Sequence, residues 1–381
     1  MRILLFANSD WYLFNFRRSL ALTLRKQGNE VLLVSPPGPY GERLTELGLE
    51  WIAAPMVRSS LNPIREIILI RWLTRLVRSR RIDLVHGFTI KCAVYGSLAA
   101  RLAGNVARVV AVAGLGFTFT SNSLKAGFLR PFVSRAMKIA FSGDRIRLIL
   151  QNTDDVRHFS ENRLIKESWI RLIPGSGVDC GSFTPRPPRD TSGIRVLIAS
   201  RMLWDKGIME YIQAARIIRR RRQDISFLMA GEPDPGNPSS VSEQQLHDWV
   251  KEGLVEWLGH VDDMPTLLHS VDIAVLPSYR EGTPKSLLEA AACGLPMITT
   301  DAPGCREVVD NGVDGLLIPV KDSEALATAI ERLASDRGTR LEMGARARAK
   351  AVAKFDSSVI ESATIAVYSE VQDVQPQSVL P

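Results

Sequence analysis

Short apolar runs alternate with longer amphipathic segments along most of the 381 residues, which is the pattern of a parallel α/β protein. Buried parallel strands have continuous Val, Ile and Leu runs, whereas crossover helices carry a single apolar stripe. In the N-terminal half the predicted strands are residues 2–6, 29–35, 50–54, 83–88, 109–112, 147–151 and 171–173. The predicted helices between them are residues 15–27, 41–47, 61–81 and 123–140.

The alternation restarts after residues 180–193, which are rich in Pro, Gly, Ser and Thr, as linkers are. Strands are then predicted at residues 195–199, 225–230, 255–258, 273–276, 296–300 and 316–318. Helices are predicted at residues 207–222, 242–252, 264–269, 284–293, 323–334 and 338–354. We therefore predict two doubly wound Rossmann-like domains, residues 1–184 and 185–356. A last helix at about residues 357–372 is expected to pack back on the first domain, and residues 373–381 are expected to fray.

The predicted helix at residues 61–81 is amphipathic and strongly basic, because isoleucines alternate along it with six arginines. One interpretation is a helix that packs on the core and exposes a solvated basic face. The other is an interfacial helix that meets anionic lipid head groups. A second basic helix is predicted at residues 123–140, with aromatic side chains among its lysines and arginines.

Charge is divided unevenly between the two halves of the chain. Residues 1–190 hold 28 Lys and Arg against 14 Asp and Glu, whereas residues 191–381 hold 20 against 27. This asymmetry predicts an anionic partner for the first half, and a membrane surface, a lipid diphosphate and a nucleic acid all qualify. The sequence has no run of 18 uncharged apolar residues, so no membrane span is predicted. The four cysteines lack metal-ligand spacing and are expected to be free thiols in a reducing cytoplasm.

The segment at residues 277–307 carries the most informative chemistry in the chain. Glu281 and Glu289 lie eight residues apart, and Gly282 and Pro284 stand between them. Proline suits the start of a helix, so the amides of residues 283–286 are predicted to open a helix N-terminus that can hold a phosphate. Carboxylates on either side of that turn suit the hydroxyls of a sugar or ribose. The alternative is an ordinary surface helix with an acidic N-terminus.

A second motif follows the first strand of the second domain. Arg201 and Lys206 precede Gly207 at a strand-to-helix turn, and two cations there suit a diphosphate. The alternative is a pair of solvent-facing charges on a loop. Both motifs follow strands of one doubly wound sheet, so they are expected to face the same crevice.

Taken together, these residues resemble retaining family-4-type glycosyltransferases. The resemblance is carried by Arg201 and Lys206, the E-x7-E pair Glu281 and Glu289, the turn at residues 259–262 (GHVD) and the two-domain layout. It covers almost the whole chain and is strongest in residues 196–320. It implies the GT-B fold, in which two Rossmann-like domains face each other across a cleft and the second holds the nucleotide-sugar.

The same resemblance assigns roles to individual residues. Arg201 and Lys206 would neutralise the donor diphosphate, Glu281 would contact the donor sugar, and Glu289 would bind the ribose hydroxyls. The remaining donor-binding candidates are Gly282, Thr283, Pro284, Lys285 and Ser286 at the phosphate, Val261 beside the base, and Gly231. His86, near the end of a predicted strand, is a further catalytic candidate. No D-x-D stands at a likely strand end, so no metal is expected, because Arg, Lys and a helix N-terminus can take the leaving charge.

The first domain is expected to bind the acceptor. Many relatives have a glycine-rich turn after the first strand, but this chain has the aromatic sequence NSDWYLFNFRR at residues 8–18. Together with DLVHGFTIK, AGLGF and QNTDD, it resembles bacterial transferases that extend undecaprenyl-diphosphate-linked glycans, which commonly use UDP-N-acetylhexosamines. The candidate acceptor-binding residues are Asn15, Arg17, Arg18, Lys91 and Gly114.

The resemblance implies a retaining, metal-independent glycosyltransferase with a UDP-sugar as co-substrate and no other cofactor. Its acceptor would be a polyprenyl-diphosphate-linked glycan at the cytoplasmic face of the inner membrane, in the assembly of a glycan or protein-glycosylation precursor. The enzyme would associate peripherally with that membrane through its basic amphipathic helices and would bind no nucleic acid. Two alternatives stay open: an enzyme like the UDP-N-acetylglucosamine 2-epimerases, and a non-catalytic protein that binds anionic surfaces.

Overall fold

The computed structural model describes residues 1–58, 60, 62–112, 124–185 and 193–373, which form two compact units. Unit 1 contains Met1–Ser176 and Glu361–Pro381, and unit 2 contains Gly177–Ile360. Residues 177–184, assigned above to the first domain, belong to unit 2. The reason is that Val178 and Cys180 are buried in its core, and the Val178 amide donates to the Phe355 carbonyl oxygen at 2.9 Å.

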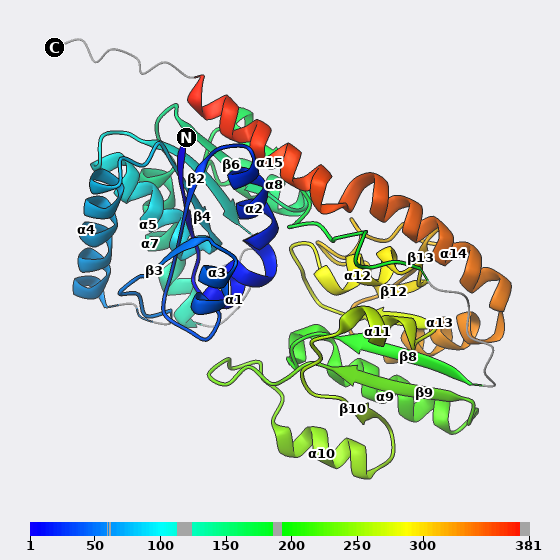
Figure 1. Ribbon diagram of the computed structural model, residues 1–381. Helices are drawn as coiled ribbons and strands as arrows, with labels where there is room; N and C mark the ends of the chain where they lie inside the picture. Colours follow the sequence, from blue (N-terminus) through cyan, green and yellow to red (C-terminus); the bar gives the residue numbers. More distant parts are fainter. Residues whose placement is uncertain (59, 61, 113–123, 186–192, 374–381) are drawn as a thin grey trace. The chain divides into compact units, whose positions relative to one another are not determined.

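Unit 1 is built on a parallel seven-stranded sheet of order β3-β2-β1-β4-β5-β6-β7 (Figure 1). The strand order reverses at β1 and β4, as in a doubly wound α/β domain. The strands are β1 (Arg2–Phe6), β2 (Glu30–Ser35), β3 (Glu50–Ala53), β4 (Leu84–Phe88), β5 (Ala107–Val112), β6 (Ile146–Leu150) and β7 (Ile170–Leu172). In β1 the four residues that follow Arg2 are fully buried, which explains why they form an unbroken apolar run.

Helices connect these strands, as right-handed crossovers require. They are α1 (Asp10–Tyr12), the π-helical η1 (Leu13–Arg17), α2 (Arg18–Lys26), α3 (Gly41–Glu46), α4 (Pro63–Ser79), α5 (Thr89–Leu102), α7 (Leu124–Ala140), α8 (Thr153–Glu161) and the 3₁₀ turn η2 (Glu167–Trp169). Helices α5 and α8 were not predicted. In α5 the buried side chains are small and surround most of the helix, so its sequence lacks a strong polar face.

Helix α4 differs from the amphipathic pattern in an informative way. Its buried side is formed by Leu69, Leu73 and Val77. In contrast, the side chains of Ile64, Ile67 and Ile68 are 69%, 50% and 53% exposed. The isoleucines therefore lie on the solvent face, in the first two turns, and arginines continue that face toward the C-terminal end. Among the described residues, no helix is long and apolar enough to cross a bilayer.

From Glu361 onward, helix α15 (Ser357–Gln372) belongs to unit 1. Thr23 Oγ1 donates to Glu361 Oε2 at 2.6 Å, and the buried Tyr368 hydroxyl lies 2.6 Å from His86 Nδ1. Glu370 accepts from Arg147 Nε and Arg171 Nε, both at 2.9 Å, and these bonds lower the Glu370 pKa. The predicted fraying of residues 373–381 lies almost wholly outside the described residues.

Unit 2 is a second parallel sheet, of six strands in the order β10-β9-β8-β11-β12-β13 (Figure 1). The strands are β8 (Ile194–Ala199), β9 (Ile225–Ala230), β10 (Glu256–Trp257), β11 (Ile273–Leu276), β12 (Met297–Thr300) and β13 (Gly315–Ile318). The helices are η3 (Trp204–Lys206), α9 (Ile208–Arg219), α10 (Glu243–Lys251), α11 (Met264–His269), α12 (Lys285–Ala292), α13 (Ser323–Ser335), α14 (Arg337–Lys350) and η4 (Ala351–Phe355). One apolar cluster forms on each face of this sheet, so the predicted pair of doubly wound α/β domains is confirmed.

Candidate active site

In unit 2 the loop after β8 and the loop after β11 are packed tightly against each other. Gly207 has a φ of +74°, and a Cβ placed on it would lie 2.1 Å from the Pro277 carbonyl oxygen. The Tyr279 amide donates to the Asp205 carbonyl oxygen at 2.9 Å, and Ser278 Oγ lies 3.1 Å from the same oxygen. Glycine is therefore required at position 207, because no side chain fits between the two loops.

This packing joins two of the predicted catalytic residues directly. Lys206 Nζ forms an ion pair with Glu281 Oε1, and Ser278 Oγ donates to that oxygen at 2.7 Å. The Lys206 and Glu281 side chains are only 18% and 12% exposed. In a site with so little water, the charges interact more strongly than surface pairs do. An ammonium is thereby fixed at the carboxyl ends of two neighbouring strands.

A second layer of contacts holds the Glu281 loop, and sequence reasoning missed it. The Tyr279 hydroxyl lies 2.8 and 2.9 Å from the two carboxylate oxygens of Glu210, which is 8% exposed. Burial, and then the Glu210 carboxylate, raises the pKa of Tyr279, so its hydroxyl stays protonated and donates. Lys321 Nζ lies 5.0 Å from the Tyr279 ring centroid. Because Glu210 lies on α9, 69 residues earlier in the chain, no local motif signals this contact.

The N-terminus of α12 follows this loop, as predicted. Pro284 precedes the first helical residue with an extended backbone (φ −72°, ψ 111°), one position earlier than the first-turn placement expected for it. Gly304 lets the loop after β12 approach, because a Cβ there would lie 2.4 Å from the carbonyl oxygens of both Glu281 and Gly282. Lys285 and Ser286 form the first turn of α12, and the N-terminal end of a helix attracts anions through its backbone amides and the helix dipole.

Glu289 lies one turn into α12 and is largely buried, with a side-chain exposure of 12%. Lys285 Nζ lies 3.5 Å from its Oε1. Burial raises the Glu289 pKa, and the neighbouring ammonium offsets only part of that shift. The side chain is thus a desolvated carboxylate, which strengthens any hydrogen bond that a hydroxyl donates to it.

Arg201 is more exposed than Lys206, with 48% of its side chain accessible, and it pairs with Asp234 at 2.5 Å. Asp234 belongs to the loop that begins at Gly231. A Cβ on Gly231 would lie 1.9 Å from the Ser200 carbonyl oxygen, so this glycine allows the two loops to touch. Val261 is half-buried and packs against one of the two cores of unit 2. Within the described ranges, no three His, Cys, Asp or Glu side chains gather as metal ligands would.

In unit 1 the aromatic loop after β1 forms helical turns. Ser9 Oγ caps α1 by accepting from the Tyr12 amide at 3.2 Å, so the helix begins at Asp10, earlier than predicted. Asn15 Nδ2 donates to the Trp11 carbonyl oxygen at 3.0 Å, and the Arg18 guanidinium lies 4.5 Å from the Phe14 ring centroid. Asn15 lies in η1 and Arg18 begins α2, in the helical segment that follows the carboxyl end of β1, and ligands of such sheets bind at that end.

His86 and Arg17 are buried together in unit 1. His86 is fully buried at the end of β4, and burial, followed by the charge of Arg17, lowers its pKa well below the usual value. Arg17 is 5% exposed, donates to the Tyr12 hydroxyl at 2.9 Å and lies 4.3 Å from the Phe88 ring centroid. The histidine is neutral at physiological pH. Both side chains are therefore packed inside unit 1 and do not line its surface.

Lys91 is occupied by contacts within unit 1. Its ammonium donates to the carbonyl oxygens of Val57 and Ser60 and to Glu66 Oε1, each at 2.9 Å. It thereby ties the segment after β3 to the start of α4. Gly114, the remaining acceptor candidate, lies outside the described residues.

Comparisons with known proteins identify the family of the chain. A model of the family "Glycosyl transferases group 1" matches residues 193–336, and a model of the family "Glycosyl transferase 4-like" matches residues 2–153. The chain is 29% identical, over 97% of its length and 99% of the relative's, to N,N'-diacetylbacillosaminyl-diphospho-undecaprenol alpha-1,3-N-acetylgalactosaminyltransferase of Campylobacter jejuni. It is 27% identical, over 80% of each chain, to UDP-Gal:alpha-D-GlcNAc-diphosphoundecaprenol alpha-1,3-galactosyltransferase of Escherichia coli.

Solved structures share the fold at lower identity. The Anabaena protein HepE in complex with UDP superposes with a TM-score of 0.79 at 18% identity, covering 97% of this chain and 100% of that one. A glycosyltransferase from Rickettsia africae gives 0.78 at 20% identity, covering 98% and 99%. One family model covers β1 to β6 and the other covers β8 to β13. The chain belongs to the family of group 1, family-4-like glycosyltransferases with the GT-B fold.

Proposed function

We propose that this glycosyltransferase moves a sugar, with an N-acetylhexosamine most favoured, from a UDP-sugar to a lipid-diphosphate-linked saccharide, and that the new bond retains the donor's anomeric configuration. The observation that carries the proposal is the Lys206–Glu281 pair beside the N-terminus of α12. This arrangement holds a cation for a diphosphate next to a carboxylate for a sugar. The Campylobacter jejuni and Escherichia coli relatives are named for transfer to undecaprenyl-diphosphate-linked sugars, which favours this acceptor class.

The chemistry of transfer assigns each donor-side residue a task. When the bond between the sugar C1 and the phosphate oxygen breaks, negative charge develops on the leaving UDP. In this proposal Lys206, Arg201 and the N-terminus of α12 stabilise that charge without a metal ion. Glu289 binds the ribose hydroxyls, and Glu281 accepts hydrogen bonds from the donor sugar while holding Lys206 in position.

Retention follows if the acceptor hydroxyl attacks C1 from the face that the phosphate leaves. The hydroxyl then passes its proton to an oxygen of the departing phosphate, so no separate base is needed. His86 is a poor candidate for that base, because it is fully buried and bonded to Tyr368 in unit 1. We therefore assign His86 a supporting role at the end of β4.

A membrane-bound acceptor also gives a reason for the basic first half of the chain. The solvent face of α4 combines exposed isoleucines with arginines, which suits the interface of an anionic membrane. We propose that the protein is cytoplasmic, associates peripherally with the inner membrane, and extends a precursor of a polysaccharide or of protein glycosylation.

A donor and acceptor screen tests the proposal. Purified protein is incubated with a panel of UDP-sugars and polyprenyl-diphosphate saccharides, in buffer with excess EDTA, and product mass is measured. One UDP-N-acetylhexosamine should give a product heavier by one sugar, at a rate that EDTA does not change. Absence of transfer from every donor by folded protein would refute the proposal. Interconversion of UDP-sugars without an acceptor would instead identify an epimerase.

A further inference from the structure

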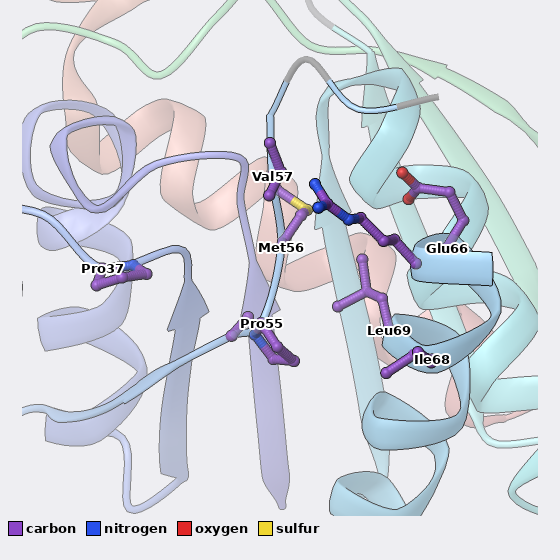
Figure 2. A pocket seen from close by; sticks show the side chains of 9 residues that line it. Pro37, Pro55, Met56, Val57, Glu66, Ile68 and Leu69 are labelled. Carbon is purple, nitrogen blue, oxygen red and sulfur yellow. The ribbon is translucent and has the colours of Figure 1, made fainter. Parts of the chain in front are cut away.

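Unit 1 contains a pocket that none of the steps above uses. It has a volume of about 420 Å³ and lies between the segment after β3 and the first turns of α4. Figure 2 shows Pro55, Met56 and Val57 on that segment beside Ile68 and Leu69 of α4. Its lining is mostly apolar, which suits a hydrocarbon ligand.

The lining has one fixed carboxylate, and it is already neutralised. Glu66 forms an ion pair with Lys91 at 2.9 Å, and the same ammonium donates to the carbonyl oxygens of Val57 and Ser60. Lys91 thus clamps both walls of the pocket together, so the cavity is formed before a ligand arrives. Pre-formed walls reduce the entropy that binding must overcome.

The position of the pocket points to the acceptor. Pro37 follows β2 and Pro55 follows β3, so the pocket lies at the carboxyl-end edge of the sheet. Asn15 and Arg18 follow β1 at the same edge, where ligands of doubly wound sheets bind. If the polar end of a lipid binds at this edge, its hydrocarbon chain can reach the pocket at the same edge of the sheet.

Charge at the rim fits an anionic end group. Arg65 lines the pocket and is exposed, and among the described residues it forms no ion pair. The exposed Ile64 and Ile67 continue the apolar surface outward from Ile68. An apolar cavity with a guanidinium at its mouth matches a chain that ends in a diphosphate.

We propose that this pocket binds the first isoprene units of the polyprenyl-diphosphate acceptor. The assignment rests on the proposed function for the identity of the lipid. In this role Val57, Ile68 and Leu69 contact the chain, Arg65 faces the diphosphate, and Lys91 is a positioning residue that keeps the walls in place.

Direct binding separates this inference from the transfer reaction. A ten-carbon isoprenyl diphosphate and ethyl diphosphate are titrated calorimetrically into the full chain. The longer ligand should bind at least about tenfold more tightly, because its chain leaves water. Ile68→Asp should remove about tenfold of that affinity and leave ethyl diphosphate unaffected. The matched control is Leu102→Asp, which changes a side chain of similar exposure (58%) at the C-terminal end of α5, outside the pocket lining, and it should bind as the wild type does.

A transfer assay supplies the second arm, with saccharide diphosphates that carry the same two chains. If the protein binds the isoprenyl ligand through Ile68 but transfers no sugar, the pocket stands and the proposed function fails. If it transfers sugar but neither binding nor KM depends on the chain or on Ile68, the function stands and the pocket assignment is wrong. If Ile68→Asp weakens binding only to vesicles of anionic phospholipid, the occupant is a bilayer lipid and the proposal is overturned.

Discussion

Replacement of Lys206 by methionine should lower both stability and turnover. The change keeps most of the side-chain volume but removes the ammonium that pairs with Glu281. Glu281 would keep the Ser278 hydroxyl as a donor, in a site where its side chain is 12% exposed. Leaving a largely buried charge without its partner costs about 3 kcal/mol.

The expected shift in thermal midpoint follows from that energy. Unit 2 spans Gly177–Ile360, and for a domain of this size about 1 kcal/mol corresponds to roughly 2–4 °C. Lys206→Met should therefore lower the melting temperature of unit 2 by roughly 6–12 °C. The double variant Lys206→Met/Glu281→Gln should recover part of this loss, because neither charge is then left alone.

Turnover should fall about 10²- to 10³-fold in Lys206→Met, the usual effect of removing one preorganised group that stabilises a developing negative charge. Scanning calorimetry and the transfer assay measure the two quantities on the same preparation. The control is Arg216→Met, which removes an exposed pair with Glu252, and it should change stability by less than about 1 kcal/mol and leave turnover intact. Normal turnover in a destabilised Lys206→Met would show that the pair is purely structural and would refute the assigned role.

Three further outcomes follow from the same site. Glu289→Ala should raise the KM for the nucleotide-sugar with a smaller effect on kcat, whereas Glu281→Ala should mainly lower kcat; wild-type kinetics in both would show that the site is misplaced. Burial raises the Glu289 pKa from its usual 4.5, so the folded protein binds the carboxyl proton more tightly than the unfolded chain does. The wild type therefore loses stability as the pH rises above 4.5. Melting curves over that pH range should show that the melting temperature of Glu289→Gln rises relative to that of the wild type. Tyr279→Phe leaves the buried Glu210 without its donor, which should cost about 1–3 kcal/mol and lower kcat more than it raises the donor KM, as denaturation and steady-state kinetics would report.

Much of the architecture could be predicted from local pattern. The strands at residues 225–230 and 273–276 have the predicted bounds, because continuous apolar runs end there at polar residues or turns. The turn at Gly207 and the start of α12 were also predictable from Gly and Pro. These signals lie within a few residues of the feature that they specify.

Features that depend on distant contacts were not predictable. His86 was expected to line a site, but Tyr368, 282 residues away, covers it. Lys91 was expected to bind the acceptor, but its ammonium donates to Glu66 and to two backbone carbonyl oxygens within unit 1. The exposure of Ile64 depends on which face of α4 packs on the sheet. The alternation of apolar and basic residues shows which side chains share a face of the helix. It does not show whether that face packs on the sheet or meets solvent.

We have proposed that the Lys206–Glu281 site transfers a sugar from a UDP-sugar to a lipid-linked acceptor and releases UDP. The most direct measurement is the number of UDP molecules released for each acceptor molecule glycosylated, with the wild type and with Lys206→Met. We predict one UDP for each product molecule in the wild type, and a loss of both in Lys206→Met. UDP release without glycosylated acceptor, or equal transfer by the two proteins, would contradict the account.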